Sequence, residues 1–170
     1  KNKVNNLYQL KNNNYVANSE ASKKVLNSLN KISKTESSIL LSGLSGSGRE
    51  FLARKIHFES NRNNKRFKVI DFSDLDEVKT EIKLFGSEEK GMIKSVGILE
   101  DVNGGTLFVK NIDKMNSKIQ GKILRVLEEK KYYRIGGVSP NNINFRIISS
   151  SEMLLNDLKK CDSFRTDLLN

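Results

Sequence analysis

At 170 residues, of which 36% are hydrophobic, the chain has the length of one domain and enough apolar residues for a continuous core. Its single cysteine, Cys161, excludes an intrachain disulfide and a zinc cluster built on thiolates. A formal net charge of +10, from 30 Lys and Arg against 20 Asp and Glu, permits an acidic partner without identifying one. No apolar run approaches the length of a membrane span and no secretory signal opens the chain, so we expect a cytoplasmic protein without a membrane partner.

The amino-terminal residues divide into a polar stretch and a first helix. Residues 1–18 are rich in Lys and Asn and lack a sustained hydrophobic period, which is typical of a linker. From Ser19, a candidate N-cap, apolar residues recur at helical spacing and predict an amphipathic helix that ends near Lys34.

Residues 38–54 have the pattern of a buried strand, a glycine-rich turn and the opening of a helix. A tight glycine loop turns its N–H groups inward and, with the positive end of the following helix, cradles phosphate. The spacing is that of a phosphate-binding loop, although Arg49 stands where that loop calls for Lys and Glu50 where it calls for Ser or Thr. The candidate nucleotide-binding residues are Gly43, Ser45, Gly46, Ser47, Gly48, Arg49 and Glu50.

Helices and strands alternate along the rest of the chain. The helix after the glycine-rich turn runs to about Ser60 and carries His57, which we expect to be packed or solvated rather than a metal ligand. Apolar runs predict strands over residues 67–72, 106–109 and 145–148. Helices are predicted within residues 73–90 and over 117–130 and 153–159, and a loop bracketed by Gly86, Gly91 and Gly97.

This order of elements predicts a parallel, doubly wound α/β sheet with helices on both faces. Ligands of such sheets lie beyond the carboxyl ends of the strands. The loops at Gly43, Asp71, Lys110 and Ser149 follow those ends, so we expect them to converge on one candidate site.

Eight short motifs, in order along the chain, resemble those of one family. They are Gly43–Glu50, Ala53–His57, Leu84–Gly86, Gly104–Phe108, Gln120–Leu127, Arg134–Gly137, Arg146–Ile148 and Phe164–Leu168. From about Tyr15 the chain resembles the AAA+ central domain of bacterial sigma-54-dependent transcriptional activators and response regulators.

The resemblance implies a P-loop α/β/α sandwich of three layers with a mainly parallel sheet. It also implies a ring-forming ATPase that remodels sigma-54 RNA polymerase through a projecting loop. We expect an AAA+ α/β subdomain over residues 15–170, truncated before the family's helical lid, and a linker over residues 1–14.

Four positions depart from the family's catalytic pattern. Lys110 and Asn111 stand where the family has the Asp that holds magnesium and the Glu that prepares the attacking water. A Lys cannot ligate magnesium, and an amide cannot act as a base. The family's Asn at the end of the second strand is Asp71 here, so a swapped pair of Asp71 and Asn111 can still hydrogen-bond, and we expect Lys110 to pair with Asp71 in the metal position. Glu152 replaces the sensor Asn and adds negative charge beside the terminal phosphate.

The parts that contact other proteins also differ. Residues 91–96 are shorter than the family's sigma-contacting loop and lack its signature, which argues against a full contact with sigma-54 RNA polymerase. We expect Met92 and Ile93 to pack locally; the alternative is that they form a residual contact. Arg165 matches the first of two family arginines that act across the ring interface, and the second would fall just beyond Asn170. The implied partners are related AAA+ subunits, with DNA bound through a separate domain outside this sequence.

The sequence favours a degenerate AAA+ domain, a regulatory or scaffolding pseudo-ATPase, because the metal ligand, base, sensor and contact loop are all replaced. This interpretation predicts that ATP or ADP binds weakly and that no catalytic residue is intact. It also predicts no metal site, so Mg²⁺ is not expected as a cofactor. An alternative is a weak but active ATPase that uses Asp71 as a substitute carboxylate and Arg49 on the phosphates. A third interpretation, a basic nucleic-acid-binding module, rests on net charge alone.

Overall fold

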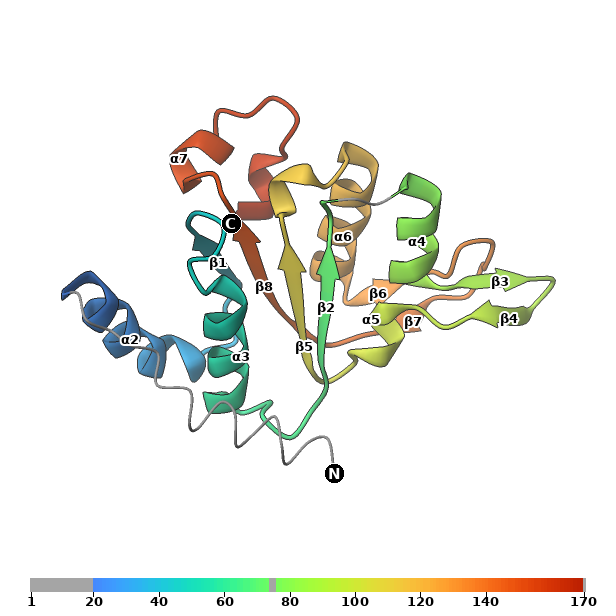
Figure 1. Cartoon of the computed structure of the whole chain (residues 1–170). Helices are drawn as coiled ribbons and strands as arrows, with labels where there is room; N and C mark the ends of the chain where they lie inside the picture. The colour runs from blue at the N-terminus through green and yellow to red at the C-terminus, as the bar shows by residue number, and fades with distance from the viewer. Residues whose placement is uncertain (1–19, 74–75, 170) are drawn as a thin grey trace.

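The computed structural model describes residues 20–73 and 76–169 (Figure 1). Four strands form one sheet, in the order β1 (Ile39–Ser42), β8 (Arg146–Ser151), β5 (Thr106–Lys110) and β2 (Phe67–Asp71). Every neighbouring pair is parallel. The predicted parallel α/β sheet is therefore confirmed.

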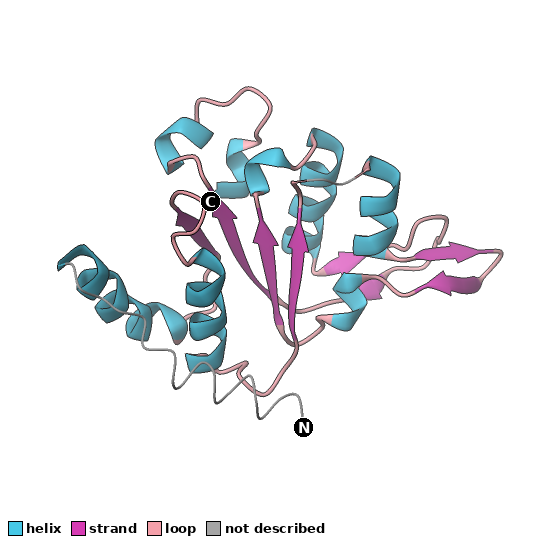
Figure 2. Cartoon of the chain, viewed as in Figure 1, coloured by secondary structure: helices cyan, strands magenta, loops and turns pink. Residues whose placement is uncertain are grey.

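Helices lie on both sides of this sheet (Figure 2). Helices α2 (Glu20–Ser33) and α3 (Arg49–Glu59) lie on one side, and α4 (Glu77–Phe85) and α6 (Ser117–Glu129) on the other. Shorter helical elements are α5 (Ile98–Asp101), η1 (Ile112–Lys114), α7 (Leu155–Leu158) and η2 (Thr166–Leu169). The expected linker over residues 1–14 and the N-cap at Ser19 lie outside the described residues.

Strand β5 separates two hydrophobic cores. Phe108 packs in one core with Ile56 of α3, whereas Leu107 and Val109 belong to the other core with Ile123 of α6. Successive side chains of a strand point to opposite faces, so this alternation directs both faces of the sheet into apolar surroundings. A strand buried on both faces explains why its sequence is a continuous apolar run.

A buried arginine joins α2 to the amino end of β8. Arg146 is 1% exposed, and its guanidinium donates to the carbonyl oxygens of Ile32 (2.8 Å), Ser33 (3.0 Å) and Ser37 (3.2 Å). The last carbonyls of a helix lack intrahelical donors, so a cation here satisfies them and interacts favourably with the helix dipole. The end of α2 is thereby fixed against the sheet.

The histidine of α3 is packed, as expected. His57 is buried, and its Nδ1 lies 2.8 Å from Thr106 Oγ1. Burial lowers the pKa of this imidazole. His57 therefore belongs to the interface between α3 and β5.

Residues 86–97 form a hairpin where a loop was predicted. Strands β3 (Ser87–Glu89) and β4 (Met92–Ser95) pair antiparallel around Lys90 and Gly91, which both have positive φ. The prediction that Met92 and Ile93 pack locally is wrong, because their side chains are 60% and 53% exposed. A two-residue turn with positive φ suits a hairpin, and this local signal outweighs the weak apolar pattern of its strands.

Other boundaries also differ from the predictions. Strand β8 continues through three buried serines, Ser149–Ser151, because their backbones pair with β1 and the first of them also with β5. The last predicted helix is only Leu155–Leu158. A second ribbon, in which β6 (Lys131–Tyr132) pairs antiparallel with β7 (Asn141–Asn142), was not expected.

Among the described residues, no helix has the length and apolar character needed to cross a membrane.

Candidate phosphate-binding site

The glycine-rich loop connects β1 to α3 in the conformation that its sequence requires. Gly46 and Gly48 have φ of 79° and 82°, the left-handed region that favours glycine. Gly43 N donates to Ser151 O (3.1 Å), which attaches the loop to the end of β8, and Ser47 N donates to Leu44 O (3.1 Å). Ser45 and Ser47 are exposed on this loop.

The loop offers free donors at the amino end of α3. Within the described part of the chain, the backbone N–H groups of Gly46, Gly48 and Arg49 have no hydrogen-bond acceptor, and no side chain caps the helix. Uncapped N–H groups and the helix dipole together favour an anion. The loop therefore has the geometry of a phosphate cradle.

The carboxyl ends of all four strands meet at the edge of the sheet where this loop lies (Figure 1). The parallel register pairs Asp71 with Lys110 and Ser42 with Ser151. Glu152 directly follows β8, and Asn111 directly follows β5. The predicted convergence of the strand ends is confirmed, although β8 ends at Ser151 and the loop predicted at Ser149 begins only after it.

The side chain of Lys110 lies between two carboxylates. Its Nζ is 3.0 Å from Asp71 Oδ2 and 3.7 Å from Glu50 Oε2. The expected ion pair with Asp71 is present, and Glu50 is an additional partner. Because Glu50 lies in the first turn of α3, the ammonium also connects β5 to the start of that helix.

The swapped pair of Asp71 and Asn111 is hydrogen-bonded. Asn111 Nδ2 donates to Asp71 Oδ1 (2.7 Å), and Ser73 donates to the same oxygen through N (3.0 Å) and Oγ (2.8 Å). Burial acts to raise the pKa of Asp71, but the hydrogen bonds from Lys110, Ser73 and Asn111 outweigh it and hold the pKa well below its usual value. Asn111 adopts φ of 54°, which is uncommon for a residue other than glycine.

Arg49 of the loop pairs with Glu152. Its Nη2 lies 3.4 Å from Glu152 Oε1, while Nη1 is buried without a hydrogen-bond partner in the described part of the molecule. The Arg49 side chain is 13% exposed, so its guanidinium lies against the protein and not in bulk water. On the next turn of α3, Arg54 donates to Glu50 Oε1 through Nε (3.1 Å) and Nη2 (2.8 Å).

The site therefore neutralises its own charges. Three cations, Arg49, Arg54 and Lys110, each pair with at least one of three carboxylates, Glu50, Asp71 and Glu152. The residues do not fit a magnesium site of the family type, because an ammonium contacts the strand-end carboxylate. No group of three or more metal-ligating side chains occurs among the residues that the structure describes.

Arg165 makes a different set of contacts. Its guanidinium pairs with Asp167, with Nη2 2.7 Å from Oδ2 and Nε 3.2 Å from Oδ1. Its backbone N donates to Gln120 Oε1 (2.7 Å), a fully buried side chain of α6. The structure thus gathers the loop with Asp71, Lys110, Asn111 and Glu152, and it holds Arg165 in its own ion pair.

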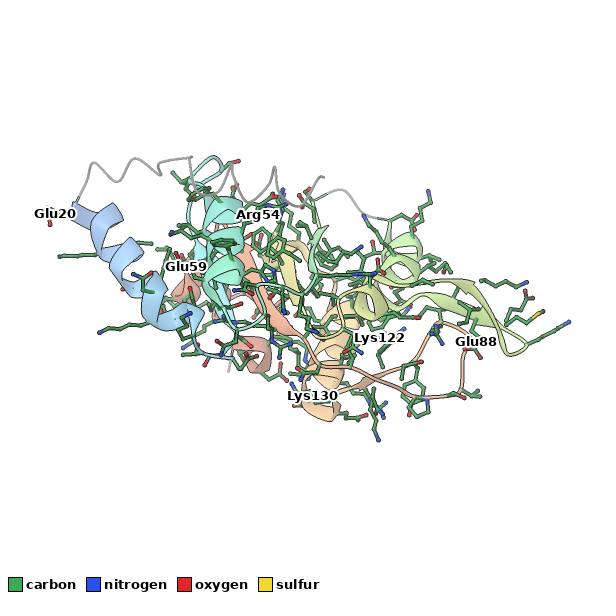
Figure 3. All side chains as sticks on the ribbon, turned by 90° about the horizontal axis from the view of Figure 1, so that it is seen from below. Glu20, Arg54, Glu59, Glu88, Lys122 and Lys130 are labelled. Carbon is green, nitrogen blue, oxygen red and sulfur yellow. The ribbon has the colours of Figure 1, made fainter. Side chains whose placement is uncertain are left out.

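The pairing of Arg49 with Glu152 and the bridging role of Glu50 were not predicted. The signal was the sign of the charges: an acidic residue replaces a neutral sensor while the loop keeps a cation. Opposite charges on adjacent strand ends tend to pair. Figure 3 shows Arg54 on α3, next to α2, and Glu88 well away from it, toward the hairpin.

Comparisons with known proteins agree with this geometry. The family model of the sigma-54 interaction domain matches residues 15–170. The transcriptional regulatory protein FlbD of Caulobacter vibrioides is 35% identical over 153 residues, 88% of this chain and 34% of FlbD. Crystal structures of NtrX from Brucella abortus in complex with ADP and with ATP have TM-scores of 0.85 at 32% identity and cover 98% of this chain and 36% and 37% of NtrX.

The chain thus spans about a third of the length of these relatives. The match over residues 15–170 and the parallel sheet with its glycine-rich loop point to the same family. The chain belongs to the sigma-54 interaction domain family and has the P-loop AAA+ fold.

Proposed function

We propose that this domain is a nucleotide-binding regulatory module of a sigma-54-dependent transcriptional regulator, without efficient ATP hydrolysis. The observation that carries the proposal is the contact of Lys110 Nζ with Asp71 Oδ2 at 3.0 Å, at the strand end where the family holds its metal. An ammonium in that position opposes the entry of a divalent cation, because like charges repel at short range.

Two further features argue against turnover. Asn111 follows β5 where the family has its catalytic carboxylate, and an amide does not accept a proton from water. Asp71, the alternative base, accepts bonds from Lys110, Asn111 and Ser73, which lower its pKa. A carboxylate with so low a pKa is a weak general base.

Nucleotide binding is supported by the free N–H groups of the loop and by Arg49. The NtrX relatives that were crystallised with ADP and with ATP share this fold at 32% identity. The guanidinium replaces a compact ammonium, so the fit to phosphate changes and we expect weaker binding than in relatives with Lys. A cofactor that binds without being consumed suits a regulatory or scaffolding role.

The family also suggests partners for the whole protein. We propose that the domain contacts related AAA+ subunits and that a separate domain binds DNA. The hairpin β3–β4 replaces the longer loop with which the family touches sigma-54 RNA polymerase, so we expect this contact to be weakened. Exposed Met92 and Ile93 at the hairpin are its remaining apolar groups.

The test is a pair of measurements on the full-length protein: calorimetric titration with ADP and ATP, and steady-state phosphate release with Mg²⁺. We expect binding that is lost in Arg49→Glu and no phosphate release above background at any protein concentration. Magnesium-dependent turnover that disappears in Asp71→Ala would overturn the pseudo-ATPase in favour of a weak ATPase. Absence of nucleotide binding would overturn the proposed cofactor.

A further inference from the structure

We infer that the site selects a metal-free nucleoside diphosphate over a triphosphate. The inference rests on the proposed nucleotide binding and adds which nucleotide the site prefers. Two observations carry it, a lysine that serves as a fixed counter-ion and a glutamate that pairs with the arginine of the loop.

The fixed counter-ion is Lys110. Its place beside Asp71 follows from the register of β2 and β5, and its ammonium is held by Asp71 and Glu50. A covalently attached cation is present at every nucleotide concentration, whereas Mg²⁺ must be bound together with the nucleotide. A cation of the chain itself therefore lies at the metal position, and a divalent ion that approaches it would be repelled.

The discriminating residue is Glu152. Its Oε1 lies 3.4 Å from Nη2 of Arg49, whereas Nη1 of the same guanidinium is buried in the protein. A phosphate that takes Nη2 as its donor must therefore displace the carboxylate of Glu152. The displaced carboxylate is 52% exposed and is solvated by water, but it stays beside the loop and repels each further negative charge there.

The balance of charge gives the same preference. The three cations and three carboxylates of the site cancel, so the loop N–H groups and the dipole of α3 carry the attraction for phosphate. That attraction is short-ranged and falls off within the first turn of the helix. An additional phosphate adds negative charge near Glu152 without an additional cation, and the triphosphate therefore binds more weakly.

The experiment compares ADP with ATP by calorimetric titration of the full-length protein in EDTA and in Mg²⁺. In EDTA we expect ADP to bind about ten-fold more tightly than ATP, a difference equivalent to about 1.4 kcal/mol. Adding Mg²⁺ is expected to weaken the apparent affinity for both nucleotides, because the metal captures the free nucleotide in solution.

A substitution that removes only the charge of the side chain tests the role of Glu152. Glu152→Gln removes the charge and keeps the shape, so the ATP affinity in EDTA should rise about five-fold or more and approach that of ADP. Glu129→Gln is the matched control: Glu129 also pairs with an arginine, Arg125, at 2.7 Å, but lies at the end of α6. It should leave both affinities within about two-fold of the unchanged protein.

The outcomes separate the two proposals. Equal affinities for ADP and ATP in EDTA, or tighter binding of ATP, would overturn the selectivity while nucleotide binding stands. An affinity for ADP that rises with Mg²⁺ would overturn the metal-free form. If neither ADP nor ATP binds to the full-length protein, and a cooperative melting transition shows that the protein is folded, the proposed nucleotide site itself would instead be overturned.

Discussion

The two ends of strand β8 hold charged side chains in opposite ways. At its first residue, Arg146 is 1% exposed, and its guanidinium donates to three carbonyl oxygens and to the hydroxyl of Thr35. Directly after its last residue, the side chain of Glu152 is 52% exposed and pairs with Arg49 at 3.4 Å. The same strand thus ends in a buried cation held by neutral acceptors and in an accessible ion pair.

The difference indicates where stability and binding reside. A buried charge that satisfies helix carbonyls cannot exchange its partners without a large cost, because water does not replace them. An exposed ion pair contributes only about 0–1 kcal/mol, so a phosphate can displace one partner at little cost. We therefore expect the amino end of the sheet to determine folding and the carboxyl end to determine ligand binding.

The largest expected effect is that of Arg146→Ala. The variant removes the donor to the carbonyl oxygens of Ile32, Ser33 and Ser37 and creates a cavity, so we expect a loss of about 3–5 kcal/mol in the free energy of unfolding. Urea unfolding followed by circular dichroism measures it. Arg125→Ala, which removes a 66% exposed arginine paired with Glu129, should cost no more than about 0.5 kcal/mol. Similar losses in the two variants would contradict the comparison.

Substituting one glycine at the amino end of the sheet and one at its carboxyl end is expected to give the next largest effect on stability. A Cβ at Gly105, just before β5, would overlap the backbone carbonyl oxygen of Arg66, whereas a Cβ at Gly46 meets no atom within 4 Å. Gly105→Ala should therefore cost about 2–3 kcal/mol through displaced backbone. Gly46→Ala should cost about 1–2 kcal/mol, because the strain lies only in its positive φ.

The nucleotide affinity of the same two variants sharpens the comparison. We expect Gly46→Ala to weaken ADP binding, since it distorts the cradle, and folded Gly105→Ala to bind normally. Calorimetric titration below the melting temperature of each variant checks this. Weakened binding in Gly105→Ala alone would show that the two ends of the sheet are not independent.

Much of the fold could be predicted because its signals are local. The apolar run of β5 and the helical period of α6 define buried elements without knowledge of their partners. The polar end of β8 could not be predicted, because Ser149–Ser151 are held by backbone pairing with neighbouring strands. Hairpin β3–β4 was missed because its strands are short and their apolar side chains face solvent.

The contacts of the site likewise include one that could be predicted from the sequence and one that could not. The ion pair of Lys110 and Asp71 could be predicted, since both residues follow strands that parallel order places side by side. The pair of Arg49 and Glu152 spans 103 positions and depends on how two long side chains are directed. Sequence shows that both positions depart from the family pattern but does not show that the two charges meet.

The smallest expected effect is that of Asp71→Asn on stability. Asp71 is 37% exposed, so its ion pair with Lys110 is screened, and we expect a loss of less than about 1 kcal/mol at pH 7. Because the folded pKa of Asp71 lies below the unfolded value, its contribution is complete above about pH 4 and is lost as the pH falls further. Urea midpoints measured at intervals from pH 6 to pH 3 should therefore fall less in Asp71→Asn than in the unchanged protein. Glu128→Gln, which alters an exposed carboxylate of α6, should follow the unchanged protein. An equal decline in Asp71→Asn would show that Lys110 does not hold Asp71 ionised, and the metal position would then lack its built-in cation.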